Sequence, residues 1–240
     1  MCFDMKKFIL AIAACAAMAS CAPKSEVALF PVSDFETTVD GQNVSIYTLK
    51  AGDLVMQVTN FGGRVVALWT PDKDGRYEDI VLGYNNINDY VSNPGERFLG
   101  AVVGPYANRI AGGTYTIGEE TYNFPQNNNG QTLHGGLKGL DMVVWNVDQV
   151  TESSIVLSYL CPDGQDGMPG NRNIVMTYTL TPDNEFKVDY VAETDKATHM
   201  NISHHSFFNL KGEANGTIND HVLYINASNT TPVDSVLIPT

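Results

Sequence analysis

Two short stretches of the chain place histidines beside glycines or aromatic residues. His134 is followed by two glycines, which let the backbone approach a ligand closely or turn sharply. His204 and His205 are adjacent and are followed by Phe207 and Phe208. An imidazole titrates near neutrality and can donate a proton to an ether oxygen, and a phenyl face can cover the apolar side of a ring. Histidines in such surroundings indicate a site for a neutral sugar.

A third stretch adds polar groups of another kind. Asn108 and Arg109 lie between Gly104 and a later glycine pair. A guanidinium presents a rigid fork of donors that suits sugar hydroxyls. The alternative is a structural arginine that pairs with a carboxylate in a sheet. In the same way, His134 and His205 could be a loop histidine and a core histidine without a catalytic role.

The sequence contains no recognisable motif for binding a metal, a phosphate or an organic cofactor. The spacing of His199, His204 and His205 matches no compact zinc pattern, and cysteine partners are absent. The acidic stretch from Asp163 to Asp166 lacks the ligand density of a calcium-binding EF-hand loop. No glycine-rich phosphate loop occurs between a strand and a helix. We expect neither a metal nor an organic cofactor.

The elements that must position these residues read as strands. Apolar and polar residues alternate in three clear runs, which indicates strands with unlike faces: 54–58, 174–180 and 186–192. A Pro-Asp-Asn turn joins the last two as a hairpin, and residues 115–117 and 122–124 form another. Further strands are expected at 44–49, 65–69, 80–82, 143–150, 155–160 and 222–225.

Helical periodicity is nearly absent after the first residues, and only Asn86–Val91 suggests a short helical turn. Many short strands with Gly, Asn and Pro between them predict an all-β fold, a sandwich or barrel of antiparallel sheets. The chain is acidic, with a formal net charge of −13. That charge argues against nucleic acid and anionic lipid as partners, because both require a basic surface, and it favours a neutral partner.

The first residues predict export. Lys6 and Lys7 precede an apolar run, Phe8 to Ala19, that is too short to span a bilayer. Small residues then lead to Cys21, which resembles a bacterial lipoprotein signal. We expect residues 1–20 to be a signal peptide, 21–28 a tether, and Cys21 a lipid anchor at a periplasm-facing membrane surface. A plain secretory signal is the alternative.

One cysteine would remain free in the mature chain, Cys161, so no disulfide framework is expected. It follows a predicted strand and precedes a Pro-Asp-Gly turn. We interpret it as a small, partly buried residue rather than as a nucleophile.

In its ordered motifs the chain resembles the aldose 1-epimerase (galactose mutarotase) family. The matching stretches run through much of the chain: 59–65, 79–84, 100–104, 107–111, 133–136, 163–171, 205–210 and 231–240. The resemblance implies a large antiparallel β-sandwich over 29–240, with the sugar on a concave face. It also implies interconversion of the α and β anomers of aldohexoses such as galactose and glucose, without a cofactor.

Carried to this sequence, the resemblance makes His205 the general acid and His134 a second catalytic histidine that hydrogen-bonds the sugar. Asn108 and Arg109 become hydroxyl binders. His204 stands where the family often has asparagine or threonine. The family's general-base glutamate falls beyond Thr240, so we expect the domain to be incomplete at its C-terminus. Three alternatives stay open: a non-catalytic carbohydrate-binding lipoprotein on the same scaffold, an epimerase of sugar phosphates, and a purely structural sandwich protein, which leaves the grouping of polar site residues unexplained.

Overall fold

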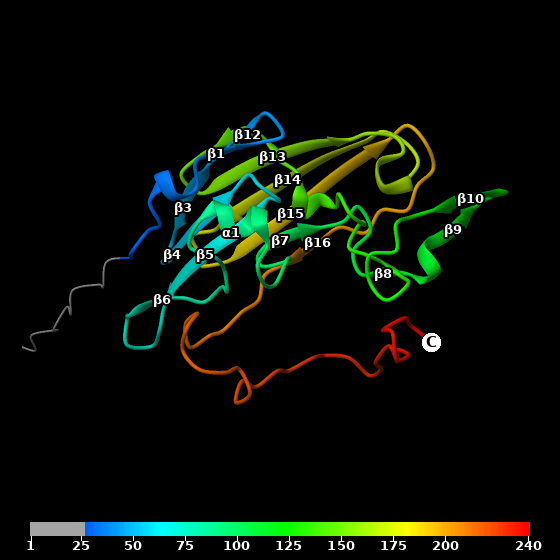
Figure 1. Cartoon of the computed structure of the whole chain (residues 1–240). Coiled ribbons are helices and arrows are strands. Elements are labelled where there is room, and N and C mark those ends of the chain that lie inside the picture. The colour runs from blue at the N-terminus through cyan, green and yellow to red at the C-terminus, as the bar shows by residue number, and fades with distance from the viewer. Residues whose placement is uncertain (1–26) are drawn as a thin grey trace, which may run out of the picture.

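The computed structural model describes residues 27–240, and most of its regular structure is β-strand (Figure 1). One antiparallel sheet has four strands, β3 (Ile46–Ala51), β4 (Leu54–Thr59), β5 (Arg64–Pro71) and β6 (Tyr77–Asp79). A register shift between Gln57 and Val58 marks a bulge where β4 meets β5. Such a bulge increases the local twist of a sheet.

A second antiparallel sheet also has four strands, β12 (Asn146–Val150), β13 (Ser154–Cys161), β14 (Arg172–Leu180) and β15 (Phe186–Thr194). Along β14, fully buried residues alternate with more exposed ones over most of the strand. This is the period-2 pattern that one buried sheet face requires.

The two sheets bury their apolar faces against each other. A single core cluster contains Leu49 and Met56 of the first sheet together with Leu157 and Met176 of the second, and all four are fully buried. Each such side chain stabilises the fold by ~1.5–3 kcal/mol through removal from water. The expected all-β antiparallel sandwich is therefore confirmed.

Shorter strands and 3-10 turns surround the two large sheets. Four two-stranded antiparallel pairs lie within 27–240: β1 (Thr37–Val39) with β2 (Gln42–Val44), β7 (Ala101–Val103) with β16 (Ser203–His205), β8 (Arg109–Ile110) with β11 (Thr132–Leu133), and β9 (Thr114–Ile117) with β10 (Glu120–Asn123). The 3-10 turns are η1 (Val32–Asp34), η2 (Ala111–Gly113), η3 (Leu140–Met142) and η4 (Gln165–Gly167).

The expected short helix is present as α1 (Ile87–Ser92). The Asn86 side chain caps it by accepting a hydrogen bond from the Asp89 N–H at 3.0 Å. Asn93 ends the helix in the left-handed conformation, which asparagine tolerates. No helix within 27–240 has both the length and the apolar character to cross a bilayer.

Two strand predictions were wrong. Residues 80–82 form no named strand, because the adjacent segment at 207–209 bonds to them without a regular ladder. The Leu82 N–H donates to the Phe207 carbonyl, and the Asn209 N–H donates to the Ile80 carbonyl. Residues 222–225 pair with no strand in the described part of the chain, and they are 66–96% exposed. β-branched composition alone does not make a strand where no partner supplies hydrogen bonds.

The predictions for the N-terminus fall outside the described residues. These are the signal peptide at 1–20, the lipid-bearing Cys21 and most of the tether at 21–28.

Candidate functional site

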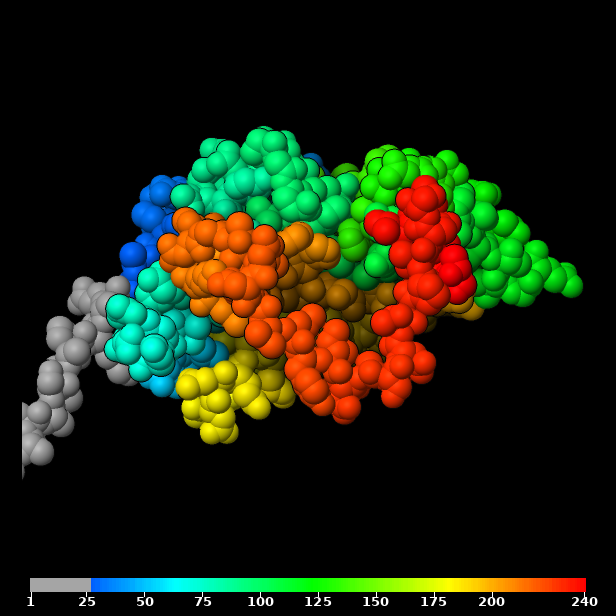
Figure 2. Space-filling view, turned by 90° about the horizontal axis from the view of Figure 1, so that it is seen from below, coloured from blue at the N-terminus to red at the C-terminus, as the bar shows by residue number. Residues whose placement is uncertain are grey.

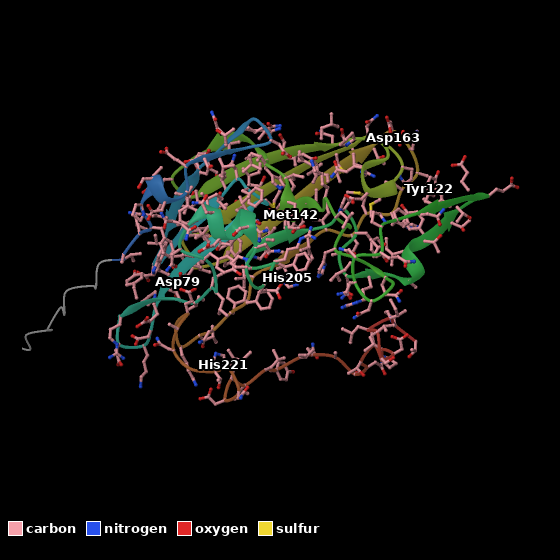
Figure 3. The ribbon with its side chains drawn as sticks, in the orientation of Figure 1. Asp79, Tyr122, Met142, Asp163, His205 and His221 are labelled. Carbon is pink, nitrogen blue, oxygen red and sulfur yellow. The ribbon has the colours of Figure 1, made fainter. Side chains whose placement is uncertain are left out.

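His205 is held at the end of strand β16. That strand pairs antiparallel with β7, where His205 lies opposite Ala101 and His204 lies opposite Val102. The two histidines point to opposite faces, as adjacent residues of a strand must: the His205 ring meets His134, and the His204 ring meets Tyr178. Figure 3 shows His205 in the middle of the molecule, away from Asp163 and Tyr122 at one end.

His134 directly follows β11, whose partner strand β8 begins directly after Asn108. The two residues bond reciprocally: the His134 N–H donates to the Asn108 carbonyl, and the Asn108 N–H donates to His134 Nδ1, both at 3.0 Å. Because Nδ1 accepts, a neutral His134 must carry its proton on Nε2. Both residues adopt left-handed backbone, with φ of 65° and 53°. Such backbone is uncommon for residues other than glycine and gathers at functional sites.

Gly135 allows the loop after His134 to turn. Its φ is 88°, and a Cβ built on it would collide with the Gly104 carbonyl. Only glycine fits a position that combines left-handed backbone with such close approach. The glycine pair noted in the sequence therefore serves the turn that presents His134.

The two candidate histidines meet. Their ring centroids are 5.1 Å apart with an interplanar angle of 84°, an edge-to-face contact. Phe98 touches both rings, at 4.6 Å from His134 and 5.8 Å from His205. Phe207 covers another side of His205 at 5.0 Å. The site is thus an imidazole pair with aromatic walls.

Burial holds His134 neutral. Its side chain is largely covered, and this desolvation lowers its pKa to about 4, with smaller contributions from His205, Arg109 and Arg97. At neutral pH His134 is therefore an uncharged donor through Nε2–H. No group within 27–240 hydrogen-bonds the ring nitrogens of His205, which leaves them open to a ligand.

Arg109 and Asn108 lie beside the histidines. Arg109 Nη1 donates to Asn108 Oδ1 at 3.3 Å, and its Nε donates to Asn128 Oδ1 at 3.2 Å. In the described part of the chain no carboxylate forms an ion pair with Arg109. The remaining guanidinium N–H groups and the exposed Asn108 amide can bind hydroxyls.

A buried ionic cluster supports this arrangement. Arg97 holds the fully buried Asp141 with two hydrogen bonds of 2.6 and 3.0 Å. Arg64 donates to the carbonyls of Arg97 and Leu99, on either side of Phe98, at 3.0 and 2.9 Å. The cluster therefore fixes the backbone that carries Phe98 and ties it to η3, just after the His134 loop.

Sequence reasoning missed Phe98, Arg97 and Asp141. Phe98 lies three residues before β7, a strand that the sequence analysis did not predict, so no local pattern marked it. Cys161 is fully buried and meets the guanidinium of Arg172 at 2.8 Å; burial raises its thiol pKa, which fits a structural residue. No cluster of metal-ligand type forms among residues 27–240.

The face that carries the site is hollowed. Figure 2, seen from below, shows a recess between the segment near residues 104–135, in green, and the segment that follows β16, in orange. These are the segments that hold His134 and follow His205. The structure brings Asn108, Arg109, His134 and His205 together: Asn108 bonds to both His134 and Arg109, and the two imidazoles meet.

Comparisons with known proteins point in one direction. The family model described as aldose 1-epimerase matches residues 45–240. The galactose mutarotase of Homo sapiens is 38% identical over 200 residues, 83% of this chain and 57% of the relative. The aldose 1-epimerase of Haemophilus influenzae is 33% identical over 202 residues, 83% of this chain and 58% of that protein.

Solved structures agree with this match. An aldose epimerase homologue from C. elegans superposes with a TM-score of 0.78 at 29% identity, covering 82% of this chain and 60% of its own. A galactose 1-epimerase from Lactobacillus acidophilus gives a TM-score of 0.64 at 29% identity, covering 73% and 52%. The chain thus spans little more than half the length of these relatives.

Proposed function

This chain belongs to the aldose 1-epimerase family, and on that premise we propose that the protein interconverts the α and β anomers of aldohexoses. Galactose and glucose are the proposed substrates. The observation that carries the proposal is the meeting of the His134 and His205 rings at 5.1 Å beside Asn108 and Arg109. An acidic protein with a net charge of −13 suits a neutral sugar better than a sugar phosphate.

His205 is the proposed general acid. Its ring proton passes to the ring oxygen of the sugar while the bond between that oxygen and C1 breaks. The proton of the anomeric hydroxyl leaves to a base, so C1 becomes an aldehyde. Rotation about the C1–C2 bond and reversal of both transfers close the ring on the other face. Each positioned acid or base contributes ~10²–10⁴-fold to such a reaction.

His134 has a different part in this mechanism. Because it is neutral at pH 7 and protonated on Nε2, it donates a hydrogen bond to the sugar rather than a full proton. Asn108 and Arg109 hold the hydroxyl groups, and Phe98 and Phe207 exclude water from one side of the imidazoles. These contacts fix the ring oxygen near His205, which is the orientation that the transfer needs.

The proposed mechanism also needs a general base that takes the proton of the anomeric hydroxyl. Within 27–240 no carboxylate hydrogen-bonds His134, His205, Asn108 or Arg109. The resemblance assigns the role to a glutamate late in the family's sequence. Activity is therefore to be measured on the protein expressed from its complete gene.

Polarimetry on freshly dissolved α-galactose tests the function. The protein is expected to speed the approach to anomeric equilibrium, and His205→Asn is expected to lower kcat by about 10²–10⁴-fold, because it removes the acid. His199→Asn is the matched control, since this exposed histidine packs on Tyr115 outside the site. An unchanged rate in His205→Asn removes His205 from the acid role.

We also propose that residues 1–20 direct export and that Cys21 carries lipid, so that the domain faces the periplasm. The support is the order of Lys6-Lys7, the apolar run and the small residues before Cys21. Mass spectrometry of the N-terminal peptide is expected to find Cys21 as the first residue with a diacylglyceryl group. A cleavage site elsewhere, or an unmodified cysteine, contradicts the anchor.

A further inference from the structure

We propose that His204 is a positioning residue: as a neutral imidazole protonated on Nδ1, it pins strand β16 from the core side and so aims His205 into the sugar site. The inference rests on the proposed function for its kinetic consequence. Its structural content, one tautomer within one chain of hydrogen bonds, stands on the geometry of Tyr178, Ser206 and Gly63.

Strand β16 needs such a pin. It has three residues, and within 27–240 its one partner strand is β7 in a two-stranded sheet, so few ladder hydrogen bonds hold it. Successive side chains point to opposite faces, so a rotation that displaces His204 must also displace His205. His204 lies between the rings of Tyr178 and Phe186, at centroid distances of 5.6 and 5.4 Å, both edge-to-face. It anchors the strand on the second sheet.

The hydrogen bonds at His204 have one consistent direction. The Tyr178 hydroxyl donates to the Gly63 carbonyl at 2.8 Å, so its single proton is used. Its oxygen, 3.2 Å from His204 Nδ1, must therefore accept a proton from that nitrogen. A neutral His204 then presents Nε2 as an acceptor, and the Ser206 hydroxyl at 2.6 Å donates to it. The chain runs from Ser206 through His204 and Tyr178 to Gly63.

This direction requires an uncharged ring. An imidazolium at 204 would have a proton on both nitrogens, so the bond with Ser206 would reverse and Nε2 would donate to the hydroxyl oxygen. Burial lowers the pKa of His204 to about 4, with a smaller contribution from His205. The neutral ring also places no positive charge beside the proton that His205 is proposed to carry.

This chain of hydrogen bonds links three distant parts of the fold. Tyr178 is fully buried on β14, and Gly63 precedes β5, so the two large sheets meet at one hydroxyl. Ser206 follows His205 directly, so the network holds the backbone on both sides of the proposed acid. A displacement of about 1 Å in a catalytic group can cost ~10²-fold in rate. The expected effect of releasing the pin is therefore large.

The first test compares two substitutions of His204. His204→Leu keeps an apolar side chain and removes both hydrogen bonds; it is expected to lower kcat by about 10–100-fold with KM within about threefold, because the hydroxyl binders are untouched. His204→Asn retains one donor near Nδ1 and is expected to recover most of kcat. A wild-type kcat in His204→Leu overturns the proposal, as does an equal loss in both variants.

Tyr178→Phe covers the case in which His204→Leu fails to fold. It removes only the oxygen between His204 and Gly63, and it is expected to lower kcat in the same direction. Tyr190→Phe is its matched control, because the Tyr190 hydroxyl is buried on the neighbouring strand and has no hydrogen-bond partner within 27–240. Equal rates in the two phenylalanine variants contradict the positioning role.

Nitrogen NMR of the histidine rings separates this inference from the proposed function. At pH 7 His204 is expected as the Nδ1–H tautomer, and His205 ring signals are expected to shift and broaden in Tyr178→Phe but not in Tyr190→Phe. An Nε2–H or doubly protonated His204 overturns the proposal. These signals decide the matter even if the wild-type protein does not catalyse mutarotation, a result that would refute the function alone.

Discussion

His134 shows how its surroundings assign a residue its chemistry. The family resemblance made it the histidine that hydrogen-bonds the sugar and gave the acid role to His205. The structure adds a physical reason for the donor role of His134, because Asn108 donates to Nδ1 and burial lowers the pKa of His134 to about 4. A group that is neutral at pH 7 with its proton on Nε2 is a hydrogen-bond donor. The role of acid in the proposed mechanism therefore falls to His205.

Phe98 is the residue whose removal most directly changes this state. Its ring lies 4.6 Å from the His134 ring, and burial is the main cause of the lowered pKa. Phe98→Ala is expected to admit water, so the pKa of His134 should rise from about 4 towards its ordinary value near 6.5. Titration of the His134 ring signals by NMR measures this directly.

Phe208→Ala serves as the comparison for Phe98. Phe208 follows the same strand β16 and is 44% exposed, but its ring contacts neither imidazole. The pKa of His134 should stay near 4 in this variant. A His134 pKa that stays near 4 in Phe98→Ala would show that other groups, not the phenyl ring, keep water from the site.

The sequence indicates some site residues and not others for a physical reason. Asn108, Arg109, His134 and His205 carry functional groups whose type and glycine or aromatic neighbours are visible in the chain. Phe98 has no such mark: it becomes part of the site only because β7 pairs with β16 and brings the residue before it beside both histidines. Contacts of this kind depend on long-range pairing, which local pattern does not encode.

At the scale of elements, the alternation of apolar and polar residues predicted strands best where one face of the sheet is buried and the other is more exposed. β14 lies between two strands and alternates in burial, and its expected range of 174–180 lies within the observed Arg172–Leu180. The hairpin of β14 and β15 and the helix α1 are also confirmed. In each case a local signal, a turn or a cap, agrees with the periodicity.

The two wrong strand predictions concern segments in which strand formation depends on a partner strand rather than on local propensity. Residues 222–225 have apolar and β-branched side chains but no partner strand, and the segment stays unpaired and exposed. Residues 80–82 contact the segment after β16 through separate hydrogen bonds rather than a ladder, and only Val81 among them is fully buried. Neither outcome can be read from one segment alone.

The whole molecule joins the site from segments far apart in sequence. The loop before β7, the loops after residues 107 and 133, and strand β16 meet near the middle of the molecule, where Figure 1 shows β7 beside β16 and Figure 3 shows His205. Arg64, Arg97 and Asp141 join the loop before β7 to η3, which follows the His134 loop. His204 holds strand β16 from the core side. The large sheets supply rigidity, and short connections supply the reactive groups.

The central claim is that His134 and His205 serve one sugar site. Titration of the protein from its complete gene with galactose, followed through the ring signals of its histidines, tests this most directly. The account predicts that the His134 and His205 signals move together with a single dissociation constant, while those of His199 and His221 stay in place. If galactose binds and either site histidine does not respond, the two rings do not share a substrate and the account is wrong.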